Sequence, residues 1–129
     1  MRKPKLPKPT DAELSILRAL WDCGPSTVRT IWEQLNPEHQ TGYTTILKLM
    51  QIMFEKGLLR RDETERSHVY YASLTQEQTQ RQVVGHVLER VFAGSAPRLV
   101  MQALAGRKAS REELAEIRRL LDEMEGGAK

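Results

Sequence analysis

Cysteine, aromatic residues and long apolar runs are all scarce in this sequence. The single cysteine, Cys23, excludes an internal disulfide and suits a reducing compartment. No apolar run reaches the roughly eighteen residues that a membrane-spanning helix needs. The basic residues at the N-terminus have no apolar segment behind them, so they do not form a signal peptide. We therefore expect a cytoplasmic protein without a membrane anchor, in which Cys23 ends a helix and is not a nucleophile.

The sequence motifs of enzymes and metal sites are absent as well. There is no glycine-rich phosphate loop, no nucleophile elbow and no HExxH pair of metal ligands. The three histidines, His39, His68 and His86, fall in a predicted turn, strand and helix without the spacing of a metal site. We expect no enzymatic activity, no metal and no cofactor.

The excess of positive charge is small. The formal net charge is +3; residues 1–74 hold 11 Lys and Arg against 9 Asp and Glu, and residues 75–129 hold 9 against 8. Any affinity for DNA must therefore come from a local basic surface and from the doubling of contacts in a dimer.

Four of the basic residues lie in a proline-rich segment, residues 1–9. Pro4, Pro7 and Pro9 oppose helix formation there, so we expect a disordered basic tail. Two alternatives are open for this tail: it follows a DNA minor groove, or it stays in solvent without touching DNA.

Three short helices with tight connections are predicted in residues 10–56. A capping box, Thr10 to Glu13, opens the first helix, and Gly24 with Pro25 ends it. The second helix opens at Ser26-Thr27 and stops at Asn36-Pro37. A short polar turn then leads to the third helix. This arrangement is that of a helix-turn-helix.

The third helix, residues 43–55, is apolar around most of its circumference. The apolar arc consists of Tyr43, Ile46, Leu47, Leu49, Met50, Met53 and Phe54. The remaining strip is polar apart from Ile52, and consists of Thr44, Thr45, Lys48, Gln51 and Glu55. Such a helix is expected to be embedded on most sides and open along one strip. Hydroxyls, an amide and one cation can approach base edges, so we predict that Thr44, Thr45, Lys48 and Gln51 face DNA. A buried helix of a small bundle is the alternative.

A β-hairpin is predicted directly after this helix. Gly57 is placed to end the helix, residues 58–61 start an extended segment, and residues 68–72 are rich in β-formers. A lone hairpin is marginally stable in water, so it must pack on the helices, as the wing of a winged helix does. We expect Arg66 on the wing, and Arg29 near the start of the second helix, to hold phosphates.

Six segments of the sequence, in this order, carry a resemblance to a known family: TDAELSILRALW, STVRTIWEQL, YTTILKLMQIMFEKGLLRR, HVYYASL, GSAPRLVMQAL and SREELAEIRRLLDEM. These segments resemble the penicillinase-repressor (BlaI/MecI/CopY-type) family of bacterial winged-helix regulators. They cover nearly all of residues 10–124, and the YTT–L–EKGL pattern and the YY strand are the most specific. The resemblance implies a homodimer that binds a two-fold operator and blocks transcription. It also implies that the C-terminal helices form the dimer contact and that Thr44, Thr45 and Lys48 face the groove.

Two features of that family differ in this chain. Some relatives sense copper through clustered C-terminal cysteines, and this chain has none there. Others are inactivated by cleavage at an Asn-Phe bond in the helix that corresponds to residues 97–105, where this chain has Gln102-Ala103. The resemblance thus implies a releasing protease as a partner. The bond of this chain at the cleavage position, Gln102-Ala103, departs from the family's Asn-Phe pattern.

Residues 75–125 are predicted to form three further helices that serve assembly. The first helix opens with a capping box at Thr75 to Gln78 and runs to about Phe92. The middle helix opens at Ser95 with Pro97, and the last opens with a capping box at Ser110 to Glu113. Short amphipathic helices lack a core of their own, so they either fold back onto the winged helix or pair with a second copy. We favour pairing, because a two-fold dimer also doubles the DNA contacts. The predicted dimer contacts are Val84, Val87, Leu88, Val91, Leu99, Ile117, Leu121 and Met124.

The sequence thus predicts a mainly α-helical fold in two domains. A winged-helix DNA-binding domain, with a three-helix core and a two- or three-stranded β wing, occupies residues 10–74, and a helical dimerisation domain occupies residues 75–125. The predicted function is a sequence-specific transcriptional regulator, a dimeric repressor on a two-fold operator. The alternative is a winged helix used as a protein-interaction module in a larger assembly. Steeply salt-dependent binding to duplex DNA separates the two.

Overall fold

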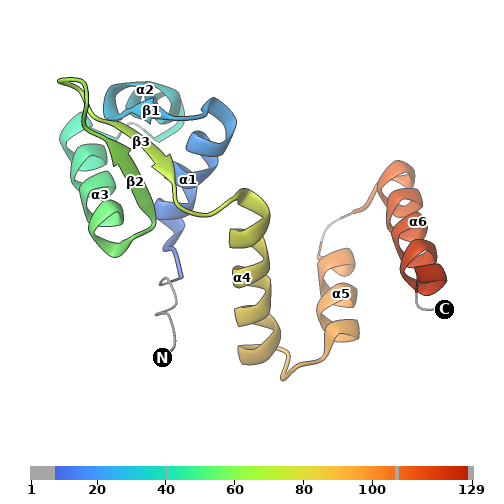
Figure 1. Cartoon of the computed structure of the whole chain (residues 1–129). Helices are drawn as coiled ribbons and strands as arrows, with labels where there is room; N and C mark the ends of the chain where they lie inside the picture. Colours follow the sequence, from blue (N-terminus) through green and yellow to red (C-terminus); the bar gives the residue numbers. More distant parts are fainter. Residues whose placement is uncertain (1–7, 40, 107, 128–129) are drawn as a thin grey trace. The chain divides into compact units, whose positions relative to one another are not determined.

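The computed structural model of the chain describes residues 8–39, 41–106 and 108–127 (Figure 1). These residues fall into two compact units, and the boundary along the chain lies between Val84 and Gly85. Most of the predicted basic tail, residues 1–7, lies outside the described residues.

Helix α1 spans Asp11–Cys23, and the predicted capping box opens it. The Thr10 hydroxyl accepts a hydrogen bond from the Glu13 amide at 3.2 Å, and Glu13 Oε1 accepts one from the Thr10 amide at 2.9 Å. Together these bonds satisfy two amides that would otherwise lack partners. Gly24 ends the helix at a φ of 81°, which a residue with a side chain rarely adopts.

Helix α2 spans Val28–His39 and helix α3 spans Tyr43–Lys56. The predicted stop at Asn36-Pro37 is wrong, because α2 continues to His39. Proline removes one amide donor from a helix and its ring crowds the carbonyl four residues earlier, and α2 tolerates this cost in its last turn. Helix α3 ends as predicted at Gly57, which has a left-handed φ of 88°.

The wing is part of a three-stranded antiparallel sheet with the order β1-β3-β2. Strand β1 is Ser26–Thr27, β2 is Leu59–Asp62 and β3 is Val69–Ala72. Ser26 and Thr27 were predicted as the start of the second helix, but they form strand β1 and pair with β3. The Thr27 hydroxyl still accepts a hydrogen bond from the Thr30 amide at 3.2 Å, so Thr27 caps α2. Figure 1 shows the hairpin of β2 and β3 beside α3. The predicted winged helix is confirmed.

The core of the first unit lies where α1, α2 and α3 meet the sheet. Its largest fully buried apolar side chains are Ile16, Ile31, Met50, Met53 and Leu59. Each contributes about 1.5–3 kcal/mol by leaving water. Tyr70 of β3 is buried with them and attaches the wing to the helices. The core is aliphatic, as the low aromatic content predicts.

The remaining helices are α4 (Gln76–Arg90), α5 (Ala96–Ala105) and α6 (Arg111–Gly127). The predicted capping boxes at Thr75 and Ser110 are present. Helix α4 ends two residues earlier than predicted, in a tight turn where Ala93 and Gly94 both have positive φ.

The first half of α4 belongs to the first unit. Its residues Val83 and Val84 line a groove together with Leu14 and Trp21 of α1, and the Trp21 indole donates a hydrogen bond to the Leu74 carbonyl at 3.2 Å. The division after residue 74 therefore stays a prediction. In the described part of the chain, no helix is long and apolar enough to cross a membrane.

Candidate nucleic-acid interface

The predicted polar strip of α3 is exposed along its whole length. The exposed residues are Thr44, Thr45, Lys48, Gln51 and Glu55, whereas Ile46, Met50 and Met53 on the opposite side are buried. The helical phase predicted from the sequence is thus confirmed. A helix held by its apolar side with short polar groups outward can enter a groove of DNA without moving its core.

One residue of the predicted apolar arc lies on the surface. Tyr43 is 41% exposed, because it occupies the first turn of α3, where its ring meets Trp32 edge-on with centroids 5.9 Å apart. The Trp32 indole donates a hydrogen bond of 2.8 Å to the Thr41 carbonyl. These contacts fix the turn that sets the start of α3.

The far end of α3 is held by an ion pair with α1. Lys56 Nζ lies 2.7 Å from Glu13 Oε2, and the Glu13 side chain is only 2% exposed. Burial opposes ionisation of the Glu13 carboxyl, but the hydrogen bonds from Lys56 and from the Thr10 amide outweigh it and hold the Glu13 pKa below its ordinary value. Both ends of α3 are therefore anchored by contacts outside the strip.

The wing carries three arginines in two different environments. Arg60 and Arg66 are exposed. Arg61 is partly buried, and its Nε donates to Glu63 while Nη1 donates to the Tyr70 hydroxyl at 3.3 Å. The hydrogen bond to Glu63, followed by that to Tyr70, raises the pKa of Arg61, and the hydrogen bond from Arg61, followed by its charge, lowers the pKa of Glu63. Arg66, the predicted phosphate ligand, stands in solvent at the tip of the hairpin.

Arg29, the other predicted phosphate ligand, is exposed in the first turn of α2. Its Nε lies 3.7 Å from Glu33 Oε2, and the two side chains are 72% and 59% exposed. A pair so open to solvent is worth only a few tenths of a kcal/mol. Arg29 can therefore exchange Glu33 for a phosphate at little cost.

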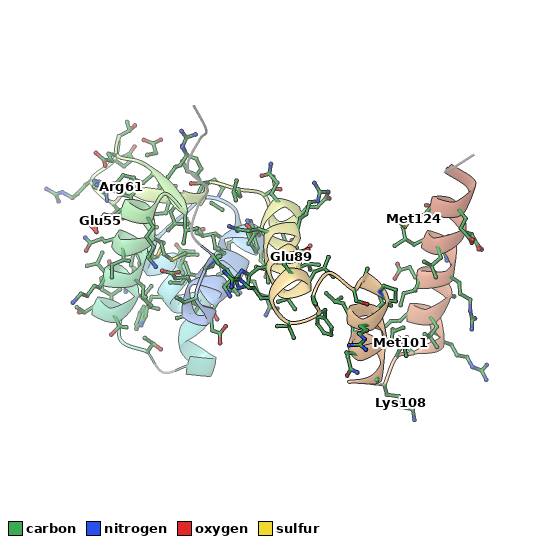
Figure 2. The ribbon with its side chains drawn as sticks, turned by 90° about the horizontal axis from the view of Figure 1, so that it is seen from below. Glu55, Arg61, Glu89, Met101, Lys108 and Met124 are labelled. Atoms are coloured by element: carbon green, nitrogen blue, oxygen red, sulfur yellow. The ribbon has the colours of Figure 1, made fainter. Side chains whose placement is uncertain are left out.

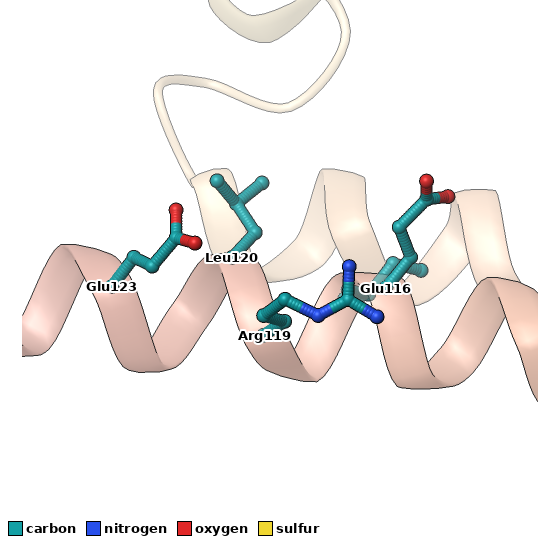
Figure 3. Close-up of a pocket in the computed structure, with 5 residues that line it drawn as sticks. Glu116, Arg119, Leu120 and Glu123 are labelled. Carbon is teal, nitrogen blue, oxygen red and sulfur yellow. The ribbon is translucent and has the colours of Figure 1, made fainter.

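Helices α4 to α6 leave many apolar side chains in solvent. Of the predicted dimer contacts, Val84, Val91, Leu121 and Met124 are exposed, and Val87, Leu88, Leu99 and Ile117 are half-buried. Met101 of α5 and Met124 of α6, labelled in Figure 2, are 67% and 63% exposed. A shallow depression on α6 contains Ile117 and Leu120 between charged residues (Figure 3). Exposed apolar side chains gathered in this way are typical of surfaces at which proteins contact a partner.

The family model described as penicillinase repressor matches residues 9–123, which is most of the chain. The chain belongs to the penicillinase repressor family. The family identity expected from the sequence is therefore confirmed, and with it the function of a DNA-binding transcriptional repressor.

Two of the similar proteins match this chain over most of its length, and a third matches about half of it. The penicillinase repressor of Bacillus licheniformis is 25% identical over 120 residues, covering 92% of this chain and 93% of that protein. The methicillin resistance regulatory protein MecI of Staphylococcus aureus is 20% identical, covering 88% and 92%. The transcriptional regulator BlaI of Mycobacterium tuberculosis is 31% identical over 67 residues, or 51% of this chain and 49% of that protein.

Two solved structures share the fold of the first unit. The DNA-binding domain of the repressor BlaI in solution matches with a TM-score of 0.51 and 22% identity, covering 57% of this chain and 90% of that one. The monomeric BlaI of Bacillus licheniformis in complex with the blaP half-operator matches with a TM-score of 0.50 and 22% identity, covering 57% and 89%. At this identity the likeness establishes the winged-helix fold.

Some positions that shape this repressor's surface were not found from its sequence. The capping box identifies Glu13, but its second partner, Lys56, lies 43 residues away, and no local pattern joins the two. Arg61 looks from the sequence like one more wing cation, equivalent to its neighbour. Strand alternation is the available signal, since it places Arg60 and Arg61 on opposite faces of the hairpin.

Proposed function

We propose that this repressor binds a two-fold symmetric operator in duplex DNA as a homodimer, with α3 of each copy in a major groove. The observation that carries the proposal is the exposed polar strip on a helix whose opposite face, with Ile46, Met50 and Met53, is buried. The residues assigned to base edges are Thr44, Thr45, Lys48 and Gln51, and those assigned to phosphates are Arg29 and Arg66.

The strip has the chemistry that the major groove requires. Lys48 presents a cation suited to the O6 and N7 acceptors of guanine, and Gln51 presents an amide that matches the donor and acceptor of adenine. The threonines Thr44 and Thr45 offer hydroxyls to either kind of group and methyls to thymine. Glu55 lies at the end of the strip, where its negative charge would be repelled by phosphate and favoured only beside the amino group of cytosine.

Dimerisation is assigned to α4, α5 and α6. A second copy of this chain is the partner, because covering Val91, Met101 and Met124 removes apolar surface from water and at the same time doubles the DNA contacts. Doubling matters here, since the net charge of the chain is only +3 and one winged helix offers few cations.

We assign the repressor to the cytoplasm, where its operator is. We assign its release from the operator to a second protein, a protease. A protease that opens α5 would disrupt the dimer and free the operator. Gln102 and Ala103 are both exposed on α5, so a protease could reach this bond once the helix unwinds.

The test is a titration of purified protein against duplexes selected from a random pool. Binding should weaken steeply with salt, with a slope of log K against log salt near 0.9 per phosphate contact in magnitude. The selected duplexes should contain inverted half-sites whose centres are about one helical turn apart, or a multiple of that. Weak binding with almost no salt dependence would instead support a protein-interaction module.

A further inference from the structure

Arg61 occupies a different environment from every other cation described on the wing. Its guanidinium carbon lies 3.9 Å from the centre of the Phe54 ring in α3 and 5.9 Å from the centre of the Tyr70 ring in β3. Its side chain is 21% exposed. Figure 2 labels Arg61 on the hairpin that follows α3. A guanidinium stacked on an aromatic face is attracted by the ring's electrons and buries its apolar stem.

The register of the hairpin explains this difference between neighbours. Arg61 is paired with Tyr70, whose side chain is buried, and Arg60 is paired with Tyr71, whose side chain is exposed. Successive residues of a strand point to opposite faces, so Arg60 points outward and Arg61 toward the helices. Its donors are also occupied, by the Glu63 carboxylate and the Tyr70 hydroxyl.

Through these contacts the side chain of Arg61 joins three parts of the winged helix. Phe54 is in the last turn of α3, Tyr70 is in the central strand of the sheet, and Glu63 is in the charged turn of the wing. Residues 62–67, which end β2 and form the turn, are all exposed, and none of them is apolar. The orientation of the turn therefore depends on the contacts at its base. Arg61 makes three of these contacts, with Glu63, Tyr70 and Phe54.

We propose that Arg61 is a positioning residue that sets the angle of the wing against α3 and does not itself bind phosphate. The inference rests on the proposed function, because it concerns how the wing and α3 engage one duplex together. Of the three arginines on the wing, Arg60 and Arg66 are then left to bind phosphates. The flat, stacked guanidinium of Arg61 cannot be replaced by an ammonium of equal charge.

The experiment compares Arg61→Lys, Arg61→Gln and Phe54→Leu with the control Arg66→Gln on a selected duplex at several salt concentrations. Arg61→Lys keeps the charge and loses the stack, and Phe54→Leu removes the other half of the same contact. Arg61→Lys, Arg61→Gln and Phe54→Leu should each weaken binding about fivefold to tenfold, and Arg61→Lys combined with Phe54→Leu little further. Arg61→Lys and Arg61→Gln should share one salt slope, because the charge at position 61 makes no phosphate contact. Arg66→Gln should lower the slope by about 0.9.

Two results would overturn the proposal. One is wild-type affinity in Arg61→Lys, because charge alone would then suffice. The other is a slope about 0.9 smaller in magnitude in Arg61→Gln than in Arg61→Lys, which is the signature of a phosphate contact made by the charge at position 61.

A measurement without DNA separates this inference from the proposed function. In free Arg61→Lys the amides of β2 and β3 should exchange hydrogen faster than in the wild type, while the amides of α1 keep their protection. If the wild type bound no duplex, the proposed function would fail and hydrogen exchange would still test the contact. Unchanged exchange in the hairpin would refute the positioning role.

Discussion

Lys56, the last residue of α3, lies 2.7 Å by its Nζ from Oε2 of Glu13, which is in the first turn of α1. The Glu13 carboxylate bonds the Thr10 amide through its other oxygen. One side chain therefore caps α1 and holds the end of the helix that carries the exposed strip. The proposed contact between the strip and DNA requires α3 to keep its orientation. The Glu13–Lys56 pair therefore links the stability of the fold to the proposed function.

The first prediction concerns the strength of that pair. A double-mutant cycle with Glu13→Gln and Lys56→Met should give a coupling of about 1–2 kcal/mol, since Lys56 is partly exposed and the full value of a buried pair does not apply. Urea unfolding measures it. The control is the exposed pair Arg81–Glu77, for which the coupling should stay below about 0.5 kcal/mol. Equal couplings in the two cycles would argue against a special role for Glu13.

The second prediction is a dependence of stability on pH. The Glu13 pKa is lower in the folded protein than its ordinary value of 4.5. The folded state therefore favours the carboxylate, and this contribution is complete above the unfolded pKa and is lost as the pH falls through the folded pKa. Unfolding free energies of the wild type and Glu13→Gln should differ most near neutral pH, and the difference should shrink as the pH falls below 4.5 and through the folded pKa. A difference that stays constant down to pH 3 would contradict this assignment.

The third prediction concerns the buried side of α3. Met50 is fully buried, so Met50→Ala should lower the free energy of unfolding by about 2–5 kcal/mol. Ile46→Ala, one turn earlier on the same face, should cost a similar amount. The matched control is Gln51→Ala on the exposed strip, for which a change within about 0.5 kcal/mol is expected. Thermal melts decide between these values, and a neutral Met50→Ala would mean that the helix is turned differently.

The parts of the fold that were predicted from the sequence depend on short-range patterns. The capping boxes at Thr10, Thr75 and Ser110 each join residues three apart, and Gly57 needs only its own backbone to end α3. The two faces of α3 follow from helical periodicity alone. In each case the physical cause lies within one element, so the sequence contains it.

The parts that were missed or wrong depend on tertiary contacts. Pro37 was predicted to end α2, and the helix continues to His39. Ser26 and Thr27 become a strand only because Tyr70 and Val69, more than forty residues later, supply the pairing. The stacking of Arg61 on Phe54 likewise depends on the register of the hairpin. The roles of the strip and the dimer contacts stay predictions.

The fourth prediction joins assembly to DNA binding. Ile117→Asp with Leu121→Asp places two carboxylates per chain on the α6 face assigned to the dimer. Burying them without partners would cost several kcal/mol, so the dimer should dissociate at about micromolar concentration while the winged helix stays folded. The second half-site then loses the benefit of tethering, and operator affinity should fall much further than stability.

Sedimentation and DNA titration on the same protein test this prediction. The control is Ala115→Asp, which adds a carboxylate at an exposed position on roughly the opposite side of α6, outside the depression, and should leave the dimer intact. A double variant that remains dimeric with full affinity would remove this face of α6 from the dimer contact. A monomer with undiminished affinity would show that dimerisation is not needed for DNA binding.

The central claim, that the α3 strip reads bases, is tested most directly by titrating Lys48→Ala against a selected duplex and a scrambled one. Lys48 is exposed, so the melting temperature should barely change. Affinity for the selected duplex should fall by about 1–3 kcal/mol, with a much smaller loss on the scrambled duplex. Equal losses on both would make Lys48 a phosphate contact, and no loss on either would contradict the placement of α3 in the groove.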